Sequence, residues 1–344
     1  MSEKYRILVF TDHRGHSVEN SIYELLGALR KQEDCAYIDV ASRGMPENDV
    51  FFKELEGTQV WATRIKSDFT YSAQADSFEL EKRKVDLKDY DVLLLRLPHP
   101  IQKGFWDHLK SVFAERRMIN QPSGIQQSSN KAFLLKLSEW CPPMALCTSK
   151  EEVLAFAEKF PIVLKPLEGY GGVGIVKISE GQAWLGKEKI EDLDAFLEKM
   201  EAENRHFLAM KFLKNVDQGD KRIVVINGQV IGASLRVPPQ GAWLCNASQG
   251  GQSVKAEVTE REEEMARDLT KKLKAIGVLF FGFDTLVNDE GQRVLSEVNT
   301  LSIGGIRQIG QQQPERPILE TVARELIEGI KEQINGSIDD LLDG

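Results

Sequence analysis

Val278-Leu279-Phe280-Phe281-Gly282-Phe283-Asp284 is an apolar run that ends on a carboxylate, and Ser296-Glu297-Val298-Asn299-Thr300 follows it after the turn signal Asn288-Asp289-Glu290-Gly291. The turn signal predicts that the two runs fold together as a β-hairpin. Glu297 and Asn299 are two residues apart, so on a strand they point to the same face. Carboxylate and amide oxygens are the ligands that Mg²⁺ prefers, and it usually shares such a site with substrate phosphates. The hairpin therefore predicts a nucleotide-phosphate site with Asp284, Glu297 and Asn299 as metal ligands.

The bulk composition describes a globular protein with an acidic balance of charge. The chain has 344 residues, which suits two or three subdomains better than one core. Its net charge of −9 argues against nucleic acid or an anionic membrane as the main partner. No run approaches the ~18–20 apolar residues of a membrane span, and no signal-peptide pattern opens the sequence. The cysteines lack metal-like spacing, so we expect free thiols in a cytoplasmic protein.

Strands that alternate with helices organise the first part of the chain. Apolar runs predict strands at residues 6–10, 36–40 and 91–95, and the apolar spacing of residues 22–29 predicts a helix. This alternation favours a parallel sheet covered on both faces. Residues 1–122 are therefore predicted to form one α/β domain. Within it, residues 46–88 have an irregular pattern to which the sequence assigns no helices or strands.

The rest of the chain is predicted to form two further segments, with a boundary between residues 205 and 206. In residues 123–205, a helix over 125–137 precedes strands at 162–165 and 175–178. Residues 206–344 begin with a strand at 207–213 and a hairpin over 222–237, whose turn is Asn227-Gly228. The two strands of the carboxylate hairpin and a terminal helix over 317–334 follow.

Gly169-Tyr170-Gly171-Gly172-Val173-Gly174 matches the pattern G-x-G-x-x-G, which is typical of dinucleotide-binding folds. That interpretation requires a helix after the loop, whereas here a strand follows. The sequence instead favours a β-loop-β flap, because bare glycine backbone can approach phosphates closely. Lys165, directly before the loop, supports the phosphate flap over a plain hairpin turn.

With these features in hand, the chain resembles the ATP-grasp superfamily and, more narrowly, bacterial glutathione synthetases. The resemblance runs from Asn120 to Ile309 and rests on the order of its motifs. They are Asn120-Gln121-Pro122, Asn130-Lys131, the segment from Val163 to Gly172, Gly219-Asp220-Lys221-Arg222, Leu235-Arg236-Val237-Pro238, Asn246 with Gly250-Gly251, Phe283-Asp284, Glu297-Val298-Asn299 and Ile306-Arg307-Gln308-Ile309.

The resemblance implies a fold and a nucleotide site. The fold is α/β, an ATP-grasp fold with an N-terminal parallel-sheet domain (1–122), a central lid subdomain (123–205) and a C-terminal antiparallel-sheet subdomain (206–344). Lys131 and Lys165 would contact the ATP phosphates, and Asp284, Glu297 and Asn299 would hold two Mg²⁺ ions, with Mn²⁺ as a second candidate. The other ATP-binding positions would be Gly169, Gly171 and Gly172 in the flap and Lys211, Phe212 and Leu213 at the adenine hinge.

The resemblance also implies a reaction. ATP would phosphorylate the C-terminal carboxylate of γ-glutamylcysteine, and glycine would attack the acyl phosphate. Arg222 and Arg236 would stabilise the transferred phosphoryl group and the oxyanion, a role that suits the bidentate guanidinium. The simpler alternative for these arginines is surface salt bridges. Substrate contacts would come from Asn246, Gly250, Gly251, Ser302, Gly304 and Arg307, although Arg307 could equally brace the helix that follows. The family also implies a homo-oligomer, a dimer or a tetramer.

The sequence departs from the family where the acid and the amine would bind. Leu244 and Gln252 stand at arginine positions of the mobile loop, Cys245 is an unfamiliar neighbour, and Ser302-Ile303-Gly304 replaces Ser-Pro-Thr. Arg96-Leu97-Pro98-His99-Pro100 replaces Arg-Lys-Asp-Pro-Pro. The identity of the small-molecule acid and amine therefore stays open. The alternatives are a ligase for another amino-acid or peptide pair, similar to D-alanine–D-alanine ligases, and a nucleotide-binding protein without ligase activity.

Overall fold

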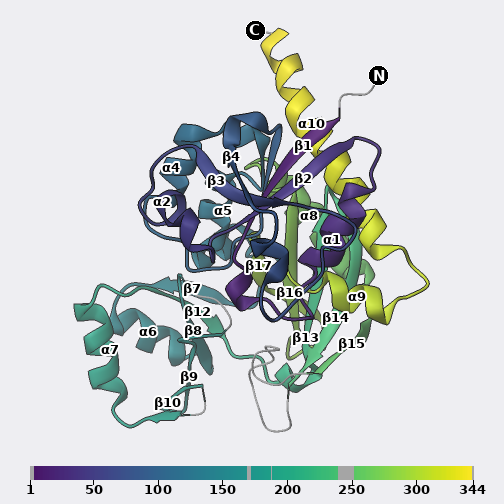
Figure 1. Ribbon diagram of the computed structural model, residues 1–344. Coiled ribbons are helices and arrows are strands. Elements are labelled where there is room, and N and C mark those ends of the chain that lie inside the picture. Colours follow the sequence, from purple (N-terminus) through teal and green to yellow (C-terminus); the bar gives the residue numbers. More distant parts are fainter. Residues whose placement is uncertain (1–3, 169–171, 187, 239–251, 343–344) are drawn as a thin grey trace.

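The computed structural model describes residues 4–168, 172–186, 188–238 and 252–342 (Figure 1). Three β-sheets organise this part of the chain, with strand orders β4-β3-β2-β1-β5-β6, β11-β10-β9-β8-β12-β7 and β15-β14-β13-β16-β17. Within the described residues, no helix is both long and apolar enough to cross a membrane. The three sheets follow one another along the chain, so the fold has three successive units.

The first sheet is parallel at its centre and antiparallel at one edge. Strands β1 (Tyr5–Thr11), β2 (Cys35–Ser42), β5 (Val92–Leu95) and β6 (Met118–Ile119) run parallel. The predicted strands at 6–10, 36–40 and 91–95 are confirmed. Strand β3 (Gln59–Arg64) pairs antiparallel with β2 and with the edge strand β4 (Arg83–Asp86). Both arise from residues 46–88, to which the sequence assigned no elements.

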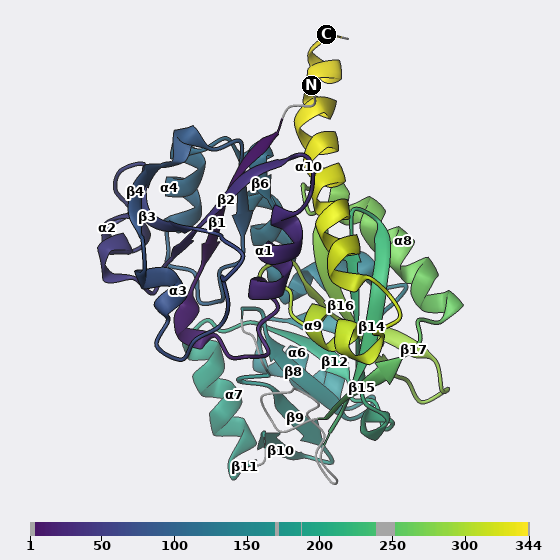
Figure 2. The same ribbon diagram turned by 45° about the vertical axis from the view of Figure 1, so that its right-hand side comes forward.

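Helices cover both faces of the first sheet. Helix α1 (Ile22–Arg30) buries Leu25, Leu26 and Leu29 on one face. The short helices α2 (Asp49–Phe52) and α3 (Asp76–Glu79) and helix α4 (Phe105–Val112) complete the unit. The long C-terminal helix α10 (Ile318–Leu342) lies along α1 and the third sheet, and their side chains form one hydrophobic core (Figure 2). The end of the chain thus joins the first unit to the third.

The second sheet contains β7 (Met144–Cys147), β8 (Ile162–Pro166), β9 (Val176–Ser179), β10 (Gln182–Leu185), β11 (Glu188–Ile190) and β12 (Phe207–Lys211). Helices α6 (Lys150–Ala157) and α7 (Leu193–Ala202) pack with it. Strand β12 pairs with β7 and β8 inside this sheet, although the predicted boundary at 205/206 assigns it to the C-terminal segment. The residues of β12 alone do not indicate which sheet the strand joins, because its partners lie far away in the sequence.

The third sheet is antiparallel. Strands β13 (Asp220–Ile226) and β14 (Gln229–Val237) form the predicted hairpin around Asn227-Gly228. Strands β16 (Phe280–Val287) and β17 (Arg293–Asn299) form the carboxylate hairpin, and β15 (Gln252–Ala256) is the edge strand. Helix α8 (Glu260–Lys274) covers one face and begins with a capping box between Thr259 and Glu262. Helix α9 (Ile306–Gln312) lies on the side of α10.

The junction between the first and third units is closed by one buried amide. The Asn120 side chain accepts hydrogen bonds from the backbone N–H groups of Leu279 (2.8 Å) and Phe280 (2.9 Å). It also donates to the carbonyl oxygens of Phe280 (2.5 Å) and Thr300 (2.7 Å). All four hydrogen-bonding positions of the amide are filled, so Asn120 fixes the end of β6 against β16.

The helix predicted over 125–137 is wrong as a single element. Helix α5 (Pro122–Ser129) ends before Asn130, and a 3₁₀ segment, η5 (Lys131–Leu137), follows. The Asn130 side chain accepts a hydrogen bond from the N–H group of Ala132 (2.9 Å). Such a local side-chain bond competes with the helix and starts a new segment at Lys131.

Candidate active site

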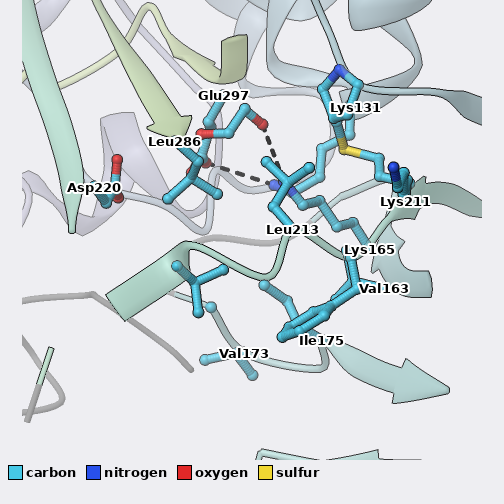
Figure 3. A pocket seen from close by; sticks show the side chains of 16 residues that line it. Lys131, Val163, Lys165, Val173, Ile175, Lys211, Leu213, Asp220, Leu286 and Glu297 are labelled. Atoms are coloured by element: carbon cyan, nitrogen blue, oxygen red, sulfur yellow. Dashed lines mark hydrogen bonds and ion pairs between the residues drawn. The ribbon is translucent and has the colours of Figure 1, made fainter. Parts of the chain in front are cut away.

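Two lysines face the carboxylate hairpin across a cleft between the second and third sheets. Lys165 lies near the end of β8, and its Nζ donates to the carbonyl oxygen of Ser296 (3.0 Å). Lys131 lies at the start of η5, with its Nζ 3.7 Å from the Glu297 carboxylate. Figure 3 shows Lys131, Lys165 and Glu297 pointing toward one another. Burial lowers the pKa of Lys165, as expected for an ammonium group withdrawn from water. The structure thus brings together three predicted site residues from three separate elements.

One end of the same cleft is lined largely by apolar side chains. Lys211, Phe212 and Leu213, at the end of β12 and beyond it, line this end together with Val163, Ile175, Met210 and Leu286. Lys211 is turned toward Asp289 (2.7 Å), and Lys177 lies 4.0 Å from the centre of the Phe212 ring. A flat aromatic base would find apolar side chains here and backbone groups at its edge, which is the usual composition of a nucleotide pocket.

The glycine loop joins β8 to β9, which pair antiparallel, so the predicted β-loop-β arrangement is confirmed. Gly172 and Gly174 adopt positive φ angles of 78° and 76°, conformations that other residues rarely adopt. Val173 between them is 76% exposed, and it lies with Ile175 on the side of the cleft opposite Glu297 (Figure 3). Gly169 and Gly171 lie outside the described residues, and phosphate contact by the loop stays a prediction.

The carboxylate hairpin places Asp284 directly opposite Glu297 in register. Asp284 is 1% exposed and accepts hydrogen bonds from Arg222, one of them at 2.8 Å. Arg236 lies 2.9 Å from the same carboxylate and also bonds Asp220 at 2.5 Å. Burial raises the pKa of Asp284, but the two guanidinium groups outweigh it and hold the pKa below its ordinary range. The alternative of surface salt bridges does not hold, because both arginines are largely buried in this cluster. The predicted catalytic role of the two arginines stays a prediction.

The donor set fits a magnesium site. Asn299 Nδ2 lies 3.4 Å from Asp284 Oδ2, and Glu297 is on the same strand as Asn299, so two carboxylates and an amide share one end of the hairpin. Hard oxygen donors beside two lysines suit Mg²⁺ with phosphates. In the described part of the chain, no three His, Cys, Asp or Glu side chains gather as a metal cluster. The predicted set has only two such ligands and would rely on substrate oxygens for the others.

Asp220 is a site residue to which the sequence analysis gave no role. It lies beside Arg236, lines the cleft and is 8% exposed. Burial, followed by repulsion from Asp284, raises the pKa of Asp220 above its ordinary value. Its signal in the sequence was the Gly219-Asp220-Lys221-Arg222 motif, where a carboxylate opens an apolar strand. Asp220 adds a second carboxylate, after Asp284, to the cluster of Arg222 and Arg236.

The predicted substrate residues lie in different places. Ser302 has a positive φ of 50° and lines a cavity at the carboxyl ends of β1 and β5, and Gly304 follows it in open space. Arg307 begins α9 and pairs with Glu24 of α1, with Glu19 3.6 Å away. The Arg307 side chain therefore holds α9 against α1. Of the two roles that the sequence allowed, substrate contact and support of the following helix, this is the second. Asn246, Gly250 and Gly251, together with Leu244 and Cys245, lie outside the described residues.

The three-sheet fold is that of the ATP-grasp ligases. Among solved structures, the chain is similar to the D-cycloserine synthetase DcsG, with a TM-score of 0.64, 13% identity, and coverage of 95% of this chain and 100% of that one. It is also similar to a D-alanine–D-alanine ligase from Bacillus anthracis complexed with ATP, with a TM-score of 0.56, 14% identity, and coverage of 96% and 99%. At such identities the likeness shows the fold, and it confirms the predicted fold class.

Sequence comparison narrows this class to one family. Residues 130–314 match the family model for the prokaryotic glutathione synthetase ATP-grasp domain. The chain is 32% identical over 252 residues to the glutathione synthetase of Parasynechococcus marenigrum (strain WH8102), covering 71% of this chain and 76% of that protein. The chain therefore belongs to the prokaryotic glutathione synthetase family and is an ATP-dependent ligase.

Proposed function

We propose that this ligase joins γ-glutamylcysteine to glycine through an acyl phosphate, with Mg²⁺ as the metal and release of ADP and phosphate. The observation that carries the proposal is the convergence of Lys131, Lys165 and Glu297 beside the Asp284 cluster, because a phosphoryl donor needs both cations and metal ligands. The family of the chain supplies the substrates. The relative named above, from Parasynechococcus marenigrum, is called a glutathione synthetase.

The residues of the cleft would act by positioning and by neutralising charge. Phosphoryl transfer needs little covalent chemistry from the protein. Lys131 and Lys165 would balance the charge of the ATP phosphates. Glu297, Asn299 and Asp284 would hold Mg²⁺, which supplies charge neutralisation at the transferring phosphoryl group when bound.

Arg222 and Arg236 would stabilise the charge that develops on the acid. Both guanidinium groups are held in place by Asp284, and Arg236 also by Asp220. Groups fixed before the reaction do not need to reorient as the acyl phosphate forms or as the amine attacks it. Phosphorylation turns a carboxylate oxygen into a leaving group, the amine displaces it as phosphate, and the new amide bond forms.

A second candidate is the same mechanism on another acid and amine. The observation that favours it is the set of changes at Leu244, Gln252 and Ser302-Ile303-Gly304, where the family would bind its substrates. Leu244 and Gln252 stand where the family has arginines in its mobile loop. Without these two positive charges, we expect the loop to bind a doubly anionic dipeptide more weakly.

Phosphate release from ATP tests the proposal. We expect release only when Mg²⁺, γ-glutamylcysteine and glycine are all present, with glutathione identified by mass spectrometry. Reactions with each substrate alone are the control for ATP hydrolysis that is not coupled to ligation. ATP binding without release from this pair would contradict the proposed substrates and support the second candidate. A panel of amino acids and dipeptides, including D-alanine, would then identify the pair.

A further inference from the structure

The carboxylate hairpin contains a β-bulge at Ser296. Asp284 of β16 lies opposite Glu297 of β17. The next residue of β16, Thr285, lies opposite Leu295. Ser296 stands between the two partners on β17 and is therefore the extra residue of the bulge. It is 6% exposed and lines the nucleotide cleft. Bulges are common beside active sites, where they redirect side chains.

The bulge determines the face of the sheet on which Glu297 lies. Leu295 and Phe283 point to the face that α8 covers and belong to one hydrophobic core. Without the extra residue, the pairing would place Glu297 opposite Phe283 on that covered face, because side chains alternate along a strand. A carboxylate would then be buried among apolar side chains, which is costly. With the bulge, Glu297 shares the other face with Asp284 and lies near Lys131.

The side chain of Ser296 fixes the bulge. Its Oγ donates to the backbone carbonyl oxygen of Asp284 across the hairpin (3.1 Å), and this hydrogen bond is buried. A bulge locally disrupts the ladder of backbone hydrogen bonds between two strands. The hydroxyl group therefore holds the extra residue against the opposite strand, at the position of a predicted metal ligand.

The backbone carbonyl group of Ser296 holds Lys165. Its oxygen accepts the hydrogen bond from Lys165 Nζ (3.0 Å). Lys165 comes from β8, so this bond joins the second sheet to the third. Because burial withdraws the ammonium group from water, a fixed carbonyl acceptor replaces part of its lost hydration. Ser296 thus contacts the predicted phosphate lysine through its carbonyl group and the metal hairpin through its hydroxyl group.

We propose that Ser296 is a positioning residue of the site for ATP and Mg²⁺, acting through its neighbours rather than by contact with substrate. Its hydroxyl group holds the bulge, and the bulge keeps Glu297 on the cleft face beside Asp284. Its carbonyl group holds Lys165 at the same site. This inference rests on the proposed metal role of the hairpin and deepens it. It adds to the metal ligands the residue that sets their position relative to Lys165.

Calorimetric titration of Ser296→Ala with ATP, with and without Mg²⁺, tests the inference. The measured quantity is the gain in ATP affinity that Mg²⁺ provides. We expect this gain to fall about 10-fold, the lower end of the range for groups that orient metal ligands, because the hydroxyl group bonds the backbone of Asp284 and not its carboxylate. The affinity for ATP alone should change less, because the carbonyl group that holds Lys165 is retained. An unchanged gain would overturn the inference.

Ser296→Thr is the conservative variant. It keeps a hydroxyl group at this position, and threonine is well suited to a strand. We expect it to retain most of the Mg²⁺-dependent gain that Ser296→Ala loses. If the two variants lose the gain equally, the hydroxyl group does not hold the bulge and the inference is wrong.

Ser234→Ala is the matched control. Ser234 lies on β14 of the same sheet, is 3% exposed, and shares a hydrogen bond with Ser253 Oγ of β15 (2.5 Å). Both alanine substitutions remove a buried hydroxyl group that links two strands, so both should lower the Tm. The Mg²⁺-dependent gain should fall in Ser296→Ala alone. An equal fall in Ser234→Ala would show a general loss of structure and would contradict a positioning role.

The titration separates failure of this inference from failure of the proposed function, because it requires neither the acid nor the amine. The unaltered enzyme could fail to turn over γ-glutamylcysteine and glycine while Mg²⁺ still raises its affinity for ATP. The proposed substrates would then be wrong, and the Ser296 variants would still decide the inference. If Mg²⁺ does not raise the ATP affinity of the unaltered enzyme, the metal assignment of the hairpin is wrong and the inference is overturned with it.

Discussion

The nucleotide cleft differs in its charges from the cavity at the carboxyl ends of β1 and β5. We call the latter the Arg96 cavity, because Arg96 lines it together with Ser302. In the cleft, Arg222 and Arg236 share Asp284, and Lys211 pairs with Asp289. In the Arg96 cavity, the guanidinium has no carboxylate partner within the described residues, and His16 is neutral. The cleft is thus held in shape by its own ion pairs before any ligand binds, whereas the cavity leaves a charge to be satisfied. The comparison shows one site whose charges are already paired and one whose buried cation is not.

Glu297→Gln is expected to have the largest effect and tests the nucleotide cleft, the first side of the comparison. The substitution removes a metal-ligand charge and the carboxylate nearest Lys131. Turnover should fall by about 100- to 1000-fold, as when one preorganised charge-stabilising group is lost from an active site. Phosphate release under saturating ATP, acid and amine measures this.

The control for that experiment is Glu264→Gln, an exposed glutamate on α8. It changes the net charge by the same amount away from the cleft, and it should keep normal turnover. Both variants should keep the circular dichroism spectrum and Tm of the parent protein. Near-normal turnover of Glu297→Gln would show that Glu297 is not a required metal ligand. The assignment of the carboxylate hairpin as the metal site would then be wrong.

Asn120→Ala is expected to act on stability, because the amide joins the unit that holds the Arg96 cavity to the unit that holds the carboxylates. It loses four hydrogen bonds, three to the backbone of Leu279 and Phe280 and one to the carbonyl oxygen of Thr300. At roughly 1 kcal/mol for each bond, the free energy of unfolding should fall by about 3–4 kcal/mol. Urea denaturation measures the loss.

Asn215→Ala is the matched control for the Asn120 experiment. The Asn215 amide makes one described hydrogen bond, to the carbonyl oxygen of Asn288 (2.7 Å), so its loss should cost about 1 kcal/mol. Equal costs for the two substitutions would mean that the two units are joined mainly by the apolar packing of α10 rather than by this amide.

The sequence predicted the nucleotide cleft better than the Arg96 cavity for a physical reason. Phosphates and metal require particular residue types at short spacings, so Lys165 before a glycine loop and Glu297 two residues from Asn299 leave a local signal. The hairpin at Asn227-Gly228 is equally local. Arg96 carried a weaker signal, because the sequence placed it only within a segment, Arg96 to Pro100, that stands where the acid and the amine would bind.

Long-range pairing explains the other differences between the sequence analysis and the structure. Strand β12 belongs to the second sheet because of partners about 40 to 60 residues earlier in the chain, and Asn120 finds its partners about 160 to 180 residues later. Strands β3 and β4 are short and contain many polar residues, so periodicity could not detect them. Patterns within a window of ten residues contain no information on such partners.

The smallest expected effect is a pH dependence of stability caused by His16. Its folded-state pKa of about 4 lies below its ordinary value of 6.5, so between these values the unfolded chain binds more protons than the folded one. Stability should therefore fall as the pH decreases from 6.5 toward 4, and His16→Gln should flatten this slope in urea denaturation. Tyr23→Phe is the control, because it removes the hydrogen bond between Tyr23 and His16 (2.9 Å) but leaves the titrating group. If Tyr23→Phe flattens the slope as much as His16→Gln does, the lost contact rather than the titration of His16 is responsible.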